Sequence, residues 1–277
     1  MRVQGGIHPE YTGDTYLDIL RGVKAEVPGI HVHAFSPLEV FQGAATLGLA
    51  VREYLLELKQ GGLGSLPGTA AEVLDDQVRR IICPDKLTTR EWLSVVEAAH
   101  SVGLKTTSTL MFGHIEGPDA IARHLVRLRA LQQRTGGFTE FVPLPFVHNQ
   151  APMYVKGEAR QGPSLREAVL LHAVARLALH PHITNIQASW VKMGPSGVGM
   201  VLETGVNDLG GTLMNESISR AAGAETGQEM TVARMQELAR AASSHHEHRI
   251  PYQRTTLYER AQQDRLDAFN ESPPPSP

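Results

Sequence analysis

Cysteine is nearly absent from this sequence, which has only Cys83 among its 277 residues. A single thiol excludes an internal disulfide and any metal site that this chain would build from several thiolates. Cys83 stands in the segment IICPDK, after one predicted helix and before the next. We therefore expect a structural cysteine, far from the carboxyl ends of the predicted strands.

Long apolar runs and an excess of one charge are also missing. No run approaches the roughly 20 apolar residues of a membrane helix, and the first residues lack the charged-then-apolar layout of a signal peptide. Lysine and arginine total 26 against 29 aspartates and glutamates, with a net charge of -3 and no basic run. This balance does not indicate binding to nucleic acid or to an anionic membrane. We expect a cytoplasmic protein that acts on small molecules.

The sequence does contain a series of helix signals. Four segments begin with Ser or Thr followed three residues later by Glu, a capping box in which a hydroxyl and a carboxylate satisfy the first backbone N–H groups. The four pairs are Ser36 and Glu39, Thr69 and Glu72, Thr88 and Glu91, and Ser164 and Glu167. Glycines typical of helix ends stand at 61–62, 103 and 136–137. We predict that a helix begins at each capping box.

Short apolar segments between these helices predict strands. They cover residues 30–35, 63–66, 104–112 and 138–146, with a further candidate at 183–193. Repetition of strand, short loop and capped helix indicates parallel β/α units. No Gly-x-Gly-x-x-Gly opens a helix, as it would in a doubly wound nucleotide-binding sheet. We therefore predict an α/β fold, a partial (β/α) barrel whose five parallel strands end near residues 5, 35, 66, 112 and 145.

Two histidines form the most distinctive chemical signal. His31 and His33 lie on one face of a predicted strand, because side chains alternate along it, and metal-dependent hydrolases on β/α barrels use such a pair as ligands. His114 and His148 are candidates for further ligands, but no aspartate ends a later strand. We therefore prefer the interpretation that the two histidines line the barrel mouth without a metal. A metal-dependent hydrolase is the less favoured alternative. The segment SHHEH at 244–248 is expected in solvent.

Other polar residues near predicted strand ends have two interpretations each. In FGHIEG, either Gly113 leaves room for a ligand against the backbone, or the segment is a plain turn with Glu116 in solvent. Lys192 is either a buried cation or a surface charge, and we prefer the second. Asn207 and Asp208, with two glycines after them, predict a tight turn.

Longer segments resemble one family. The motifs QGGIHPEYTG, HVHAFSPLEV, GLGSLPGTAAEVL, CPDKL, TSTLMFGHIE, TGGFTEFVPLPF, NIQASWVKMG, NDLGGTLMNESISRAAGA and QRTTLY follow one another over about residues 3–258. Together they are similar to the FO synthase family of radical S-adenosylmethionine enzymes, which form a deazaflavin. The resemblance is to the half that acts on tyrosine, and most of all to the C-terminal part of the fused actinobacterial form.

This resemblance implies a radical S-adenosylmethionine type of barrel and a transferase activity. Family members cleave S-adenosylmethionine reductively with a 4Fe-4S cluster, and the adenosyl radical abstracts hydrogen from L-tyrosine. The resulting 4-hydroxybenzyl group adds to 5-amino-6-(D-ribitylamino)uracil. The implied partners are these small molecules and a lyase barrel, fused or separate.

The resemblance also implies site residues, motif by motif. The positions that would contact S-adenosylmethionine are Gln4, Gly5, Gly6, Ser36, Glu72, Gly113 and Glu116. In the glycine motif, Ile7 replaces the Glu of many superfamily members. The positions that would contact tyrosine or the uracil are His33, Thr109, Gln187 and Lys192. No catalytic residue is assigned.

The family holds its cluster with three cysteines in a CxxxCxxC motif after the first barrel strand, and this sequence lacks that motif. The strand that Gly5 and Gly6 close is also too short to be a whole strand. We therefore expect that the first strand and the cluster loop precede Met1, and that this chain alone binds no cluster and is inactive. Residues 1–265 are then an incomplete barrel with a C-terminal extension, and 266–277 a disordered tail. An inactive remnant or one half of a split protein is the alternative.

Overall fold

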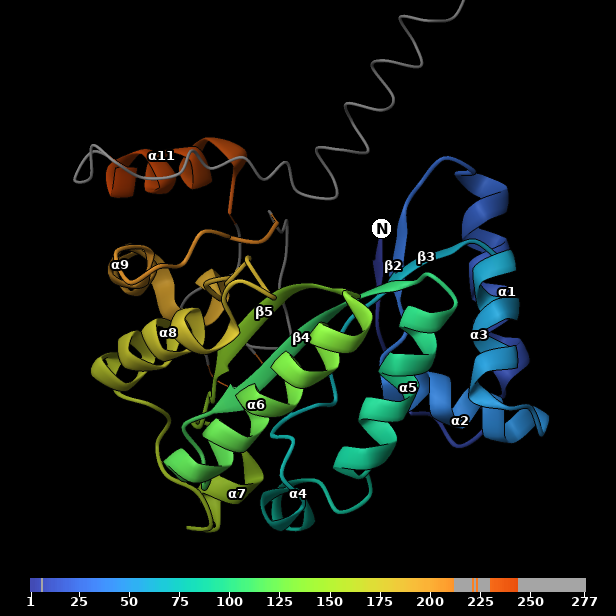
Figure 1. The fold of residues 1–277 in the computed structure, drawn as a ribbon, viewed down its shortest axis with the longest axis horizontal. Coiled ribbons are helices and arrows are strands. Elements are labelled where there is room, and N and C mark those ends of the chain that lie inside the picture. The colour runs from blue at the N-terminus through green and yellow to red at the C-terminus, as the bar shows by residue number, and fades with distance from the viewer. Residues whose placement is uncertain (6, 212–220, 222, 224–229, 244–277) are drawn as a thin grey trace, which may run out of the picture.

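A parallel sheet organises the chain, and the computed structural model describes residues 1–5, 7–211, 221, 223 and 230–243 (Figure 1). The strands are β1 (Arg2–Val3), β2 (Val32–Ala34), β3 (Leu63–Leu66), β4 (Lys105–Phe112) and β5 (Phe138–Pro145). The helices are α1 (Gly13–Glu26), α2 (Pro37–Leu47), α3 (Val51–Gln60), α4 (Asp76–Ile82), α5 (Thr89–Ser101), α6 (Pro118–Thr135), α7 (Pro152–Val155), α8 (Leu165–Leu179), α9 (Trp190–Leu202) and α11 (Val232–Ser243).

The five strands pair in the order in which they occur in the chain, and every pair is parallel. Two isolated parallel bridges continue the pairing, from Phe141 to Ile186 and from Gln187 to Asp208. A doubly wound sheet reverses its strand order at a switch point, whereas sequential order is the arrangement of a (β/α) barrel. The predicted fold class is confirmed. The predicted strand ends are also confirmed to within two residues, since the strands end at Val3, Ala34, Leu66, Phe112 and Pro145.

Three of the four predicted capping boxes begin helices. Ser36, Thr88 and Ser164 each accept a hydrogen bond from the backbone N–H of the glutamate three residues on, and that glutamate accepts one in return. These contacts begin α2, α5 and α8. Gly61 and Gly136 are the C-cap residues of α3 and α6, as their positions predict.

The fourth box, which starts at Thr69, begins no helix, and this prediction is wrong. The chain runs as a loop to α4, whose N-cap is Asp75. Just before the box, the Gly68 N–H donates to Thr107 Oγ1 (2.7 Å), and the Gly68 C=O accepts from Thr109 Oγ1 (2.7 Å). A Cβ on Gly68 would collide with the backbone of Thr107, so only glycine fits. These two hydrogen bonds to β4 fix the backbone of Gly68 in a conformation from which no helix begins.

The rest of the loop is held by the buried guanidinium of Arg79 in α4. Its acceptors are the carbonyl oxygens of Ala70, Ala71, Val73 and Leu87. Ala70 and Glu72 have positive φ angles of 58° and 44°, a left-handed conformation that costs a non-glycine residue about 1–2 kcal/mol. The hydrogen bonds to Arg79 offset this cost, because they satisfy carbonyl groups that would otherwise be buried without a donor.

The predicted strand at 183–193 is also shorter than expected. Only Ile186 and Gln187 pair with the sheet, and after Ser189 the chain becomes α9. Trp190, the first residue of α9, is buried, and its indole N–H donates to the carbonyl oxygen of Gly211 (3.2 Å). Packing of this aromatic side chain, which sequence alternation does not reveal, ends the strand early.

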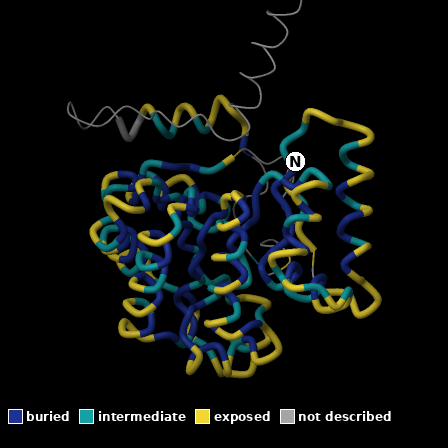
Figure 2. The backbone as a smooth tube through the Cα atoms, turned by 45° about the vertical axis from the view of Figure 1, so that its right-hand side comes forward, coloured by how far each residue is buried: buried dark blue, intermediate teal, exposed yellow. Residues whose placement is uncertain are grey.

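One continuous apolar core lies between the sheet and its helices. In Figure 2 the central strands are buried and the outer faces of the helices are exposed. Val32 and Ala34 of β2 and Leu110 of β4 belong to this core. Because side chains alternate along a strand, His33 and Thr109 point to the opposite face, toward the barrel interior. The interior of the barrel is therefore the polar side of the sheet.

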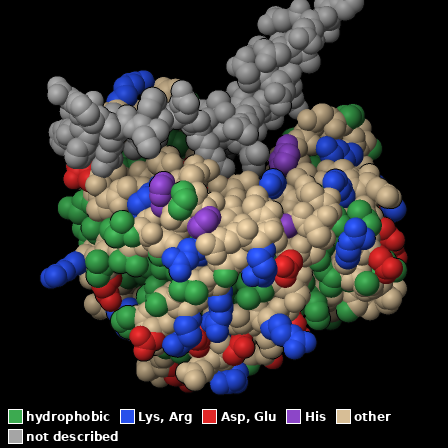
Figure 3. Space-filling model, viewed as in Figure 1, with side chains coloured by type: hydrophobic (Ala, Val, Ile, Leu, Met, Phe, Trp, Pro, Cys, Tyr) green, Lys and Arg blue, Asp and Glu red, His purple; other side chains and the backbone are tan. Residues whose placement is uncertain are grey.

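The surface carries both signs of charge. Acidic and basic side chains are intermingled on the face shown in Figure 3, without a large patch of one sign. Among the described helices, none has the length and apolar content needed to cross a membrane.

Six described histidines have a pKa below the ordinary value, because burial removes water from their charged form. They are His31, His33, His100, His114, His124 and His172. The pKa falls to about 4 for His100 and to about 3 for His33 and His124. His100 bonds the hydroxyls of Thr106 in β4 (2.9 Å) and Thr135 in α6 (2.7 Å), so it joins strand and helix as a neutral ring.

We expect the chain to lose stability as the pH falls from about 6.5 toward 4. Below the unfolded-state pKa of about 6.5, the unfolded chain binds protons that the buried histidines of the folded chain do not bind. Each such group then lowers the free energy of unfolding by about 1.4 kcal/mol per pH unit. Urea unfolding between about pH 5 and 8 measures this slope, and His100→Gln should reduce it by about one proton. A free energy of unfolding that does not change below pH 6.5 would contradict the expectation.

Replacement of Arg79 by Met should destabilise the fold. The variant leaves at least two buried carbonyl oxygens without a donor, at about 1–3 kcal/mol each. Arg80→Met is the matched control, since Arg80 is the next residue and is exposed, and we expect it to change stability by less than about 0.5 kcal/mol. Urea unfolding compares the two variants, and equal stabilities would show that the guanidinium does not hold the loop.

Candidate functional site

The candidate site lies at the edge of the sheet where the parallel strands end, which is where barrels of this type carry their functional residues. Phe35, Ala70 and Glu72 have positive φ angles of 60°, 58° and 44°, and each follows the end of β2 or β3. Strained backbone of this kind concentrates at functional sites. This carboxyl edge is therefore the candidate site.

The ends of β1 and β2 are joined by the carboxylate of Glu39, which is 2% exposed. Its Oε1 accepts from the backbone N–H of Gly5 (3.2 Å), and its Oε2 accepts from the backbone N–H and the hydroxyl of Ser36 (2.6 Å each). Gln4 Nε2 donates to the Oγ1 of Thr69 in the loop after β3 (2.6 Å). The structure therefore brings the predicted positions Gln4, Gly5 and Ser36 together.

The backbone of Gly5 is open on the side where a side chain would stand. Among the described residues, a Cβ built there would meet only Oε1 of Glu39, at 3.9 Å. This space is compatible with a ligand against the Gly5 backbone, and the contact itself stays a prediction. The next predicted position, Gly6, lies outside the described residues.

Glu72 belongs to the same edge through its backbone. Its C=O accepts from the N–H of Met111 in β4 (2.8 Å). Its carboxylate pairs with Lys86 at 2.7 Å, and both side chains are partly exposed, so the pair is worth about 1 kcal/mol or less. The Glu72 carboxylate is near the edge but already has a cation as its partner.

The turn after β4 is closed by Glu116, whose carboxylate accepts from the N–H groups of Gly113 (2.6 Å) and His114 (2.9 Å) and lies 3.6 Å from Arg160. The interpretation of Glu116 as a solvated side chain is wrong, because its carboxylate is fully buried among these groups. Gly113 has a φ of 95°, and a Cβ there would collide with Pro163. The Cβ side of Gly113 is thus filled by the chain itself, and no ligand lies against it there.

His33 is 8% exposed, and its Nδ1 bonds the hydroxyl of Ser65 (2.7 Å), which also bonds Nε2 of His31 (2.8 Å). Burial, with Arg2 and His31 nearby, lowers the pKa of His33 to about 3, so its ring is neutral at pH 7. The two histidines do not line the barrel mouth, because His31 precedes β2 and lies at the amino end of the sheet. No group of three or more His, Cys, Asp or Glu side chains in the described part of the chain is arranged to hold a metal ion. The hydrolase alternative has no support.

Gln187 meets the next short strand of the sheet. Its Nε2 donates to Oδ2 of Asp208 (3.1 Å), and Oδ1 of Asp208 accepts from the N–H of Gly210 (2.7 Å). The predicted tight turn is wrong for the backbone, because Asp208 is buried and pairs with Gln187 in a parallel bridge; only its side chain closes onto Gly210. The contact of Asp208 with Gln187 joins residues 21 positions apart, so a local turn pattern does not reveal it.

The other predicted substrate positions lie on separate elements. Thr109, in β4, faces the barrel interior, and its hydroxyl donates to the carbonyl oxygen of Gly68 (2.7 Å). Lys192 lies in the first turn of α9 and is half-buried, between the two states expected from the sequence. The segment SHHEH at 244–248 and the tail at 266–277 lie outside the described residues.

Cys83 lies on the same side of the sheet as the candidate site, and the prediction that it is far from the strand ends is wrong. It ends α4, and its C=O accepts from the N–H of Lys86 (3.1 Å), whose ammonium pairs with Glu72 of the carboxyl edge. At 7 residues, α4 is only about 10 Å long, so the chain returns to the amino end through α5 instead. Burial raises the pKa of the Cys83 thiol, which fits a structural residue.

Several residues of this edge have no clear sequence signal. Glu39 is visible as a capping residue, but not as the partner of Gly5. Ser65 stands in a predicted strand and in a family motif, but neither points to its partner His33, and Arg160 stands in no motif; their partners are far from them in the chain. Only the three-dimensional contacts identify them.

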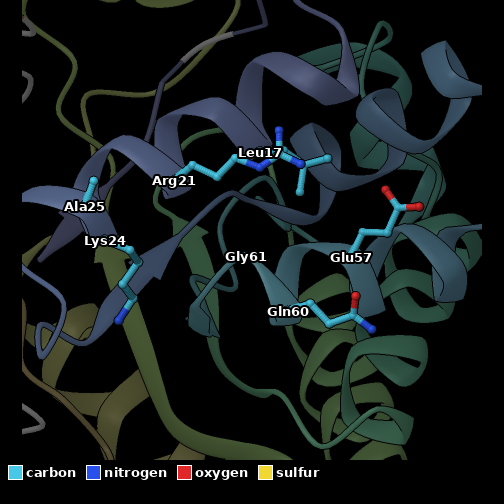
Figure 4. A pocket seen from close by; sticks show the side chains of 7 residues that line it. All are labelled: Leu17, Arg21, Lys24, Ala25, Glu57, Gln60 and Gly61. Carbon is cyan, nitrogen blue, oxygen red and sulfur yellow. The ribbon is translucent and has the colours of Figure 1, made fainter.

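A groove of about 780 Å³ lies elsewhere, between α1 and α3 (Figure 4). Arg21, Lys24, Glu57 and Gln60 line it. Arg21 pairs with Asp18 (3.0 Å), and Lys24 donates to the carbonyl oxygen of Ile30, so both cations have partners. The groove belongs to the helix layer and shares no residue with the carboxyl edge.

Comparisons with known proteins agree with the resemblance. The family described as CofH/MqnC C-terminal region matches residues 135–263. FO synthase of Streptomyces coelicolor is 51% identical over 270 residues, which are 98% of this chain and 31% of that protein. FO synthase of Mycobacterium tuberculosis is 51% identical over 256 residues, 92% of this chain and 29% of that protein. The chain thus spans about 30% of the length of these relatives.

A shorter relative is covered more fully. The 5-amino-6-(D-ribitylamino)uracil--L-tyrosine 4-hydroxyphenyl transferase of Methanopyrus kandleri is 51% identical over 257 residues, 93% of this chain and 68% of that protein. Among solved structures, methylornithine synthase matches 88% of this chain and 66% of its own, with a TM-score of 0.59 and 14% identity. At that identity it supports the fold alone.

The sequence motifs, the sequential parallel sheet and the relatives agree with one another. Half of the aligned residues are identical over more than two thirds of the Methanopyrus kandleri protein. The chain therefore belongs to the family of FO synthase and 5-amino-6-(D-ribitylamino)uracil--L-tyrosine 4-hydroxyphenyl transferase.

Proposed function

We propose that this chain is the substrate-binding part of a radical S-adenosylmethionine transferase, which joins the 4-hydroxybenzyl group of L-tyrosine to 5-amino-6-(D-ribitylamino)uracil. The observation that carries the proposal is the 51% identity over 257 residues to a protein named for that uracil and for tyrosine. The chain spans about 30% of the FO synthases, so the activity is that of a longer parent protein. We place the reaction in the cytoplasm, with a fused or separate lyase barrel as a further partner.

We assign S-adenosylmethionine to the carboxyl edge. The open backbone of Gly5 supports this assignment, as does its position next to Ser36 and Gln4. Gly113 and Glu116 contribute through the backbone of their turn, because the Glu116 carboxylate is occupied by two N–H groups. Where the cofactor is bound, it supplies the radical that begins the reaction.

We assign the two substrates to the polar interior of the barrel. His33 and Thr109 point inward from β2 and β4, and Gln187 and Lys192 follow β5 in the chain. Ring nitrogens, hydroxyls and amides are suitable partners for the phenol of tyrosine and for the polar edge of a uracil. A neutral His33 can donate to such a group or accept from it.

The 4Fe-4S cluster of the family does not fit the residues of this chain. Iron–sulfur clusters are held by cysteine thiolates, and the chain has one cysteine, buried, with a thiol pKa above its ordinary value. We infer that residues beyond these 277 hold the cluster in the parent protein. An inactive remnant, or half of a split protein, is the second candidate, and the same single cysteine favours it.

The chain alone should form no cluster and no product. Anaerobic incubation with iron and sulfide should give no 4Fe-4S absorption, because one buried thiol cannot replace three. A longer protein, extended through the sequence encoded upstream of Met1 to the expected CxxxCxxC motif, should bind the cluster and couple tyrosine to the ribityl-aminouracil. Mass spectrometry of the products measures the coupling.

The two parts of the proposal fail in different ways. A redox-active cluster in the 277-residue chain would overturn the account of the cysteines. A longer protein that cleaves S-adenosylmethionine but never consumes tyrosine would overturn the substrates. An upstream sequence without the cysteine motif would favour the remnant or the split protein.

Gly5→Ala and Gly113→Ala should separate ligand contact from folding. In the part of the chain that the structure describes, a Cβ at Gly5 meets only Glu39, whereas a Cβ at Gly113 collides with Pro163 at a positive φ. In the longer protein we expect Gly5→Ala to weaken S-adenosylmethionine binding about tenfold or more, roughly 1.4 kcal/mol, without lowering the melting temperature. Gly113→Ala should lower the melting temperature. Unchanged binding by the Gly5 variant would remove Gly5 from the site.

A further inference from the structure

Two histidines share one hydroxyl inside the barrel. The Oγ of Ser65 lies 2.7 Å from Nδ1 of His33 and 2.8 Å from Nε2 of His31. Ser65 and His33 are 5% and 8% exposed, whereas His31 is half-buried. A chain of three polar groups thus leads from the amino end of the sheet to the barrel interior.

A β-bulge makes this arrangement possible. The register of β2 on β3 shifts just before His33, which pairs with Ser65 and leaves Gly64 as the extra residue. A Cβ on Gly64 would lie 2.6 Å from Nδ1 of His31, so the imidazole occupies the space that a side chain would fill. The glycine lets His31 reach Ser65, and the bulge places the hydroxyl between the two rings.

The Ser65 hydroxyl has one proton, so it can donate a hydrogen bond to only one of the two imidazole rings at a time. Ser65 donates to one imidazole and accepts from the other. In one arrangement His31 Nε2 donates to Oγ, which donates to His33 Nδ1, and His33 carries its own proton on Nε2. In the reverse arrangement His33 Nδ1 donates to Oγ, and Nε2 of His33 is a bare base. Since neutral rings carry one proton each, the two histidines always have the same tautomer.

The second nitrogen of His33 is available for a ligand. Among the described residues, the His33 side chain hydrogen-bonds Ser65 alone, through Nδ1. Its Nε2 belongs to a ring that faces the polar interior and is more than nine-tenths buried. Through this nitrogen His33 can exchange a hydrogen bond with water or with a ligand in the barrel interior.

We propose that His33, Ser65 and His31 form a proton relay, which removes a proton from a ligand O–H or N–H group in the barrel interior and delivers it to the amino end of the sheet. The ligand gives its proton to the bare Nε2 of His33. His33 Nδ1 passes its proton to Ser65 Oγ, and Oγ passes its own proton to His31 Nε2. His31 Nδ1 then releases one proton to water. The relay thus starts from the reverse arrangement and ends, neutral, in the first one, so that protons and charge balance.

The positive charges around the two histidines favour proton transfer from the ligand toward water. Arg2 of β1 and His31 face His33, Lys24 of α1 faces His31, and β3 contributes the Ser65 hydroxyl; in the 277-residue chain the amino terminus also faces both rings. Burial and these cations lower the pKa of both rings. A proton taken from a ligand is therefore not retained on either ring.

The relay itself is a property of this chain, but its use in catalysis rests on the proposed function. His33 would touch the ligand. Ser65 and His31 act through His33 and are positioning residues. The acidic groups of the proposed substrates, a phenol O–H and the ring N–H groups of a uracil, are of the class that the relay would accept.

Nitrogen NMR of the histidine rings tests the relay without any substrate, because ¹⁵N shifts distinguish a protonated ring nitrogen from a bare one. In the 277-residue chain we expect His31 and His33 to be neutral and to have the same tautomer at about pH 7 to 8. Ser65→Ala should uncouple them, and Ser65→Thr should restore the coupling. Thr135→Val is the matched control, since it removes a hydroxyl from His100 and should change that ring alone.

Different tautomers on His31 and His33 in the unaltered chain would overturn the relay, and this comparison needs no variant. Gly64→Ala provides a second test, since it displaces the His31 ring but keeps the Ser65 hydroxyl, and coupling that persists would also overturn it. In the longer active protein, Ser65→Ala should lower kcat on the order of 10²-fold and change its pH profile, with rescue by Thr. If the longer protein does not consume tyrosine, the proposed function fails, while the NMR result still decides the relay.

Discussion

Where parallel strands end, backbone N–H and C=O groups lose their hydrogen-bond partners in the neighbouring strand. In this protein, buried charged side chains replace those partners. Glu39 accepts N–H groups at the ends of β1 and β2, and Glu116 does the same in the turn after β4. Arg79 donates to carbonyl oxygens in the loop after β3. Each side chain is buried with its acceptors or donors, so each loop has one stable arrangement. The shape of the candidate site depends on these satisfied backbone groups.

The parts of the fold that follow from local patterns could be predicted. Strand ends need only apolar segments between helix signals, and the helices at Ser36, Thr88 and Ser164 need only a cap and an apolar face. The box at Thr69 has the same local pattern and forms no helix. The difference lies in contacts of Gly68 with β4, about 40 residues later in the chain. No window of a few residues contains that information.

Part of the candidate site could also be predicted from local motifs. The glycine motif and a capping box lead to Gly5 and Ser36, which the structure brings together through one carboxylate. The role of Ser65 was not predictable, because LGSL reads as an ordinary strand and its partners lie 32 and 34 residues away. For Glu116 the sequence pattern allowed a plain turn with the side chain in solvent, whereas the nearby N–H groups and Arg160 bury its carboxylate.

Sequential strand order also affects how such a chain can fold. Each strand pairs with the strand before it, so every new pairing closes a loop of one β/α unit, however long the chain has become. The entropy of loop closure therefore stays nearly the same for each step, and the average sequence separation of contacts remains low for a parallel sheet. Units can be added one at a time, from either end of the sheet, without rearrangement of the pairs already formed.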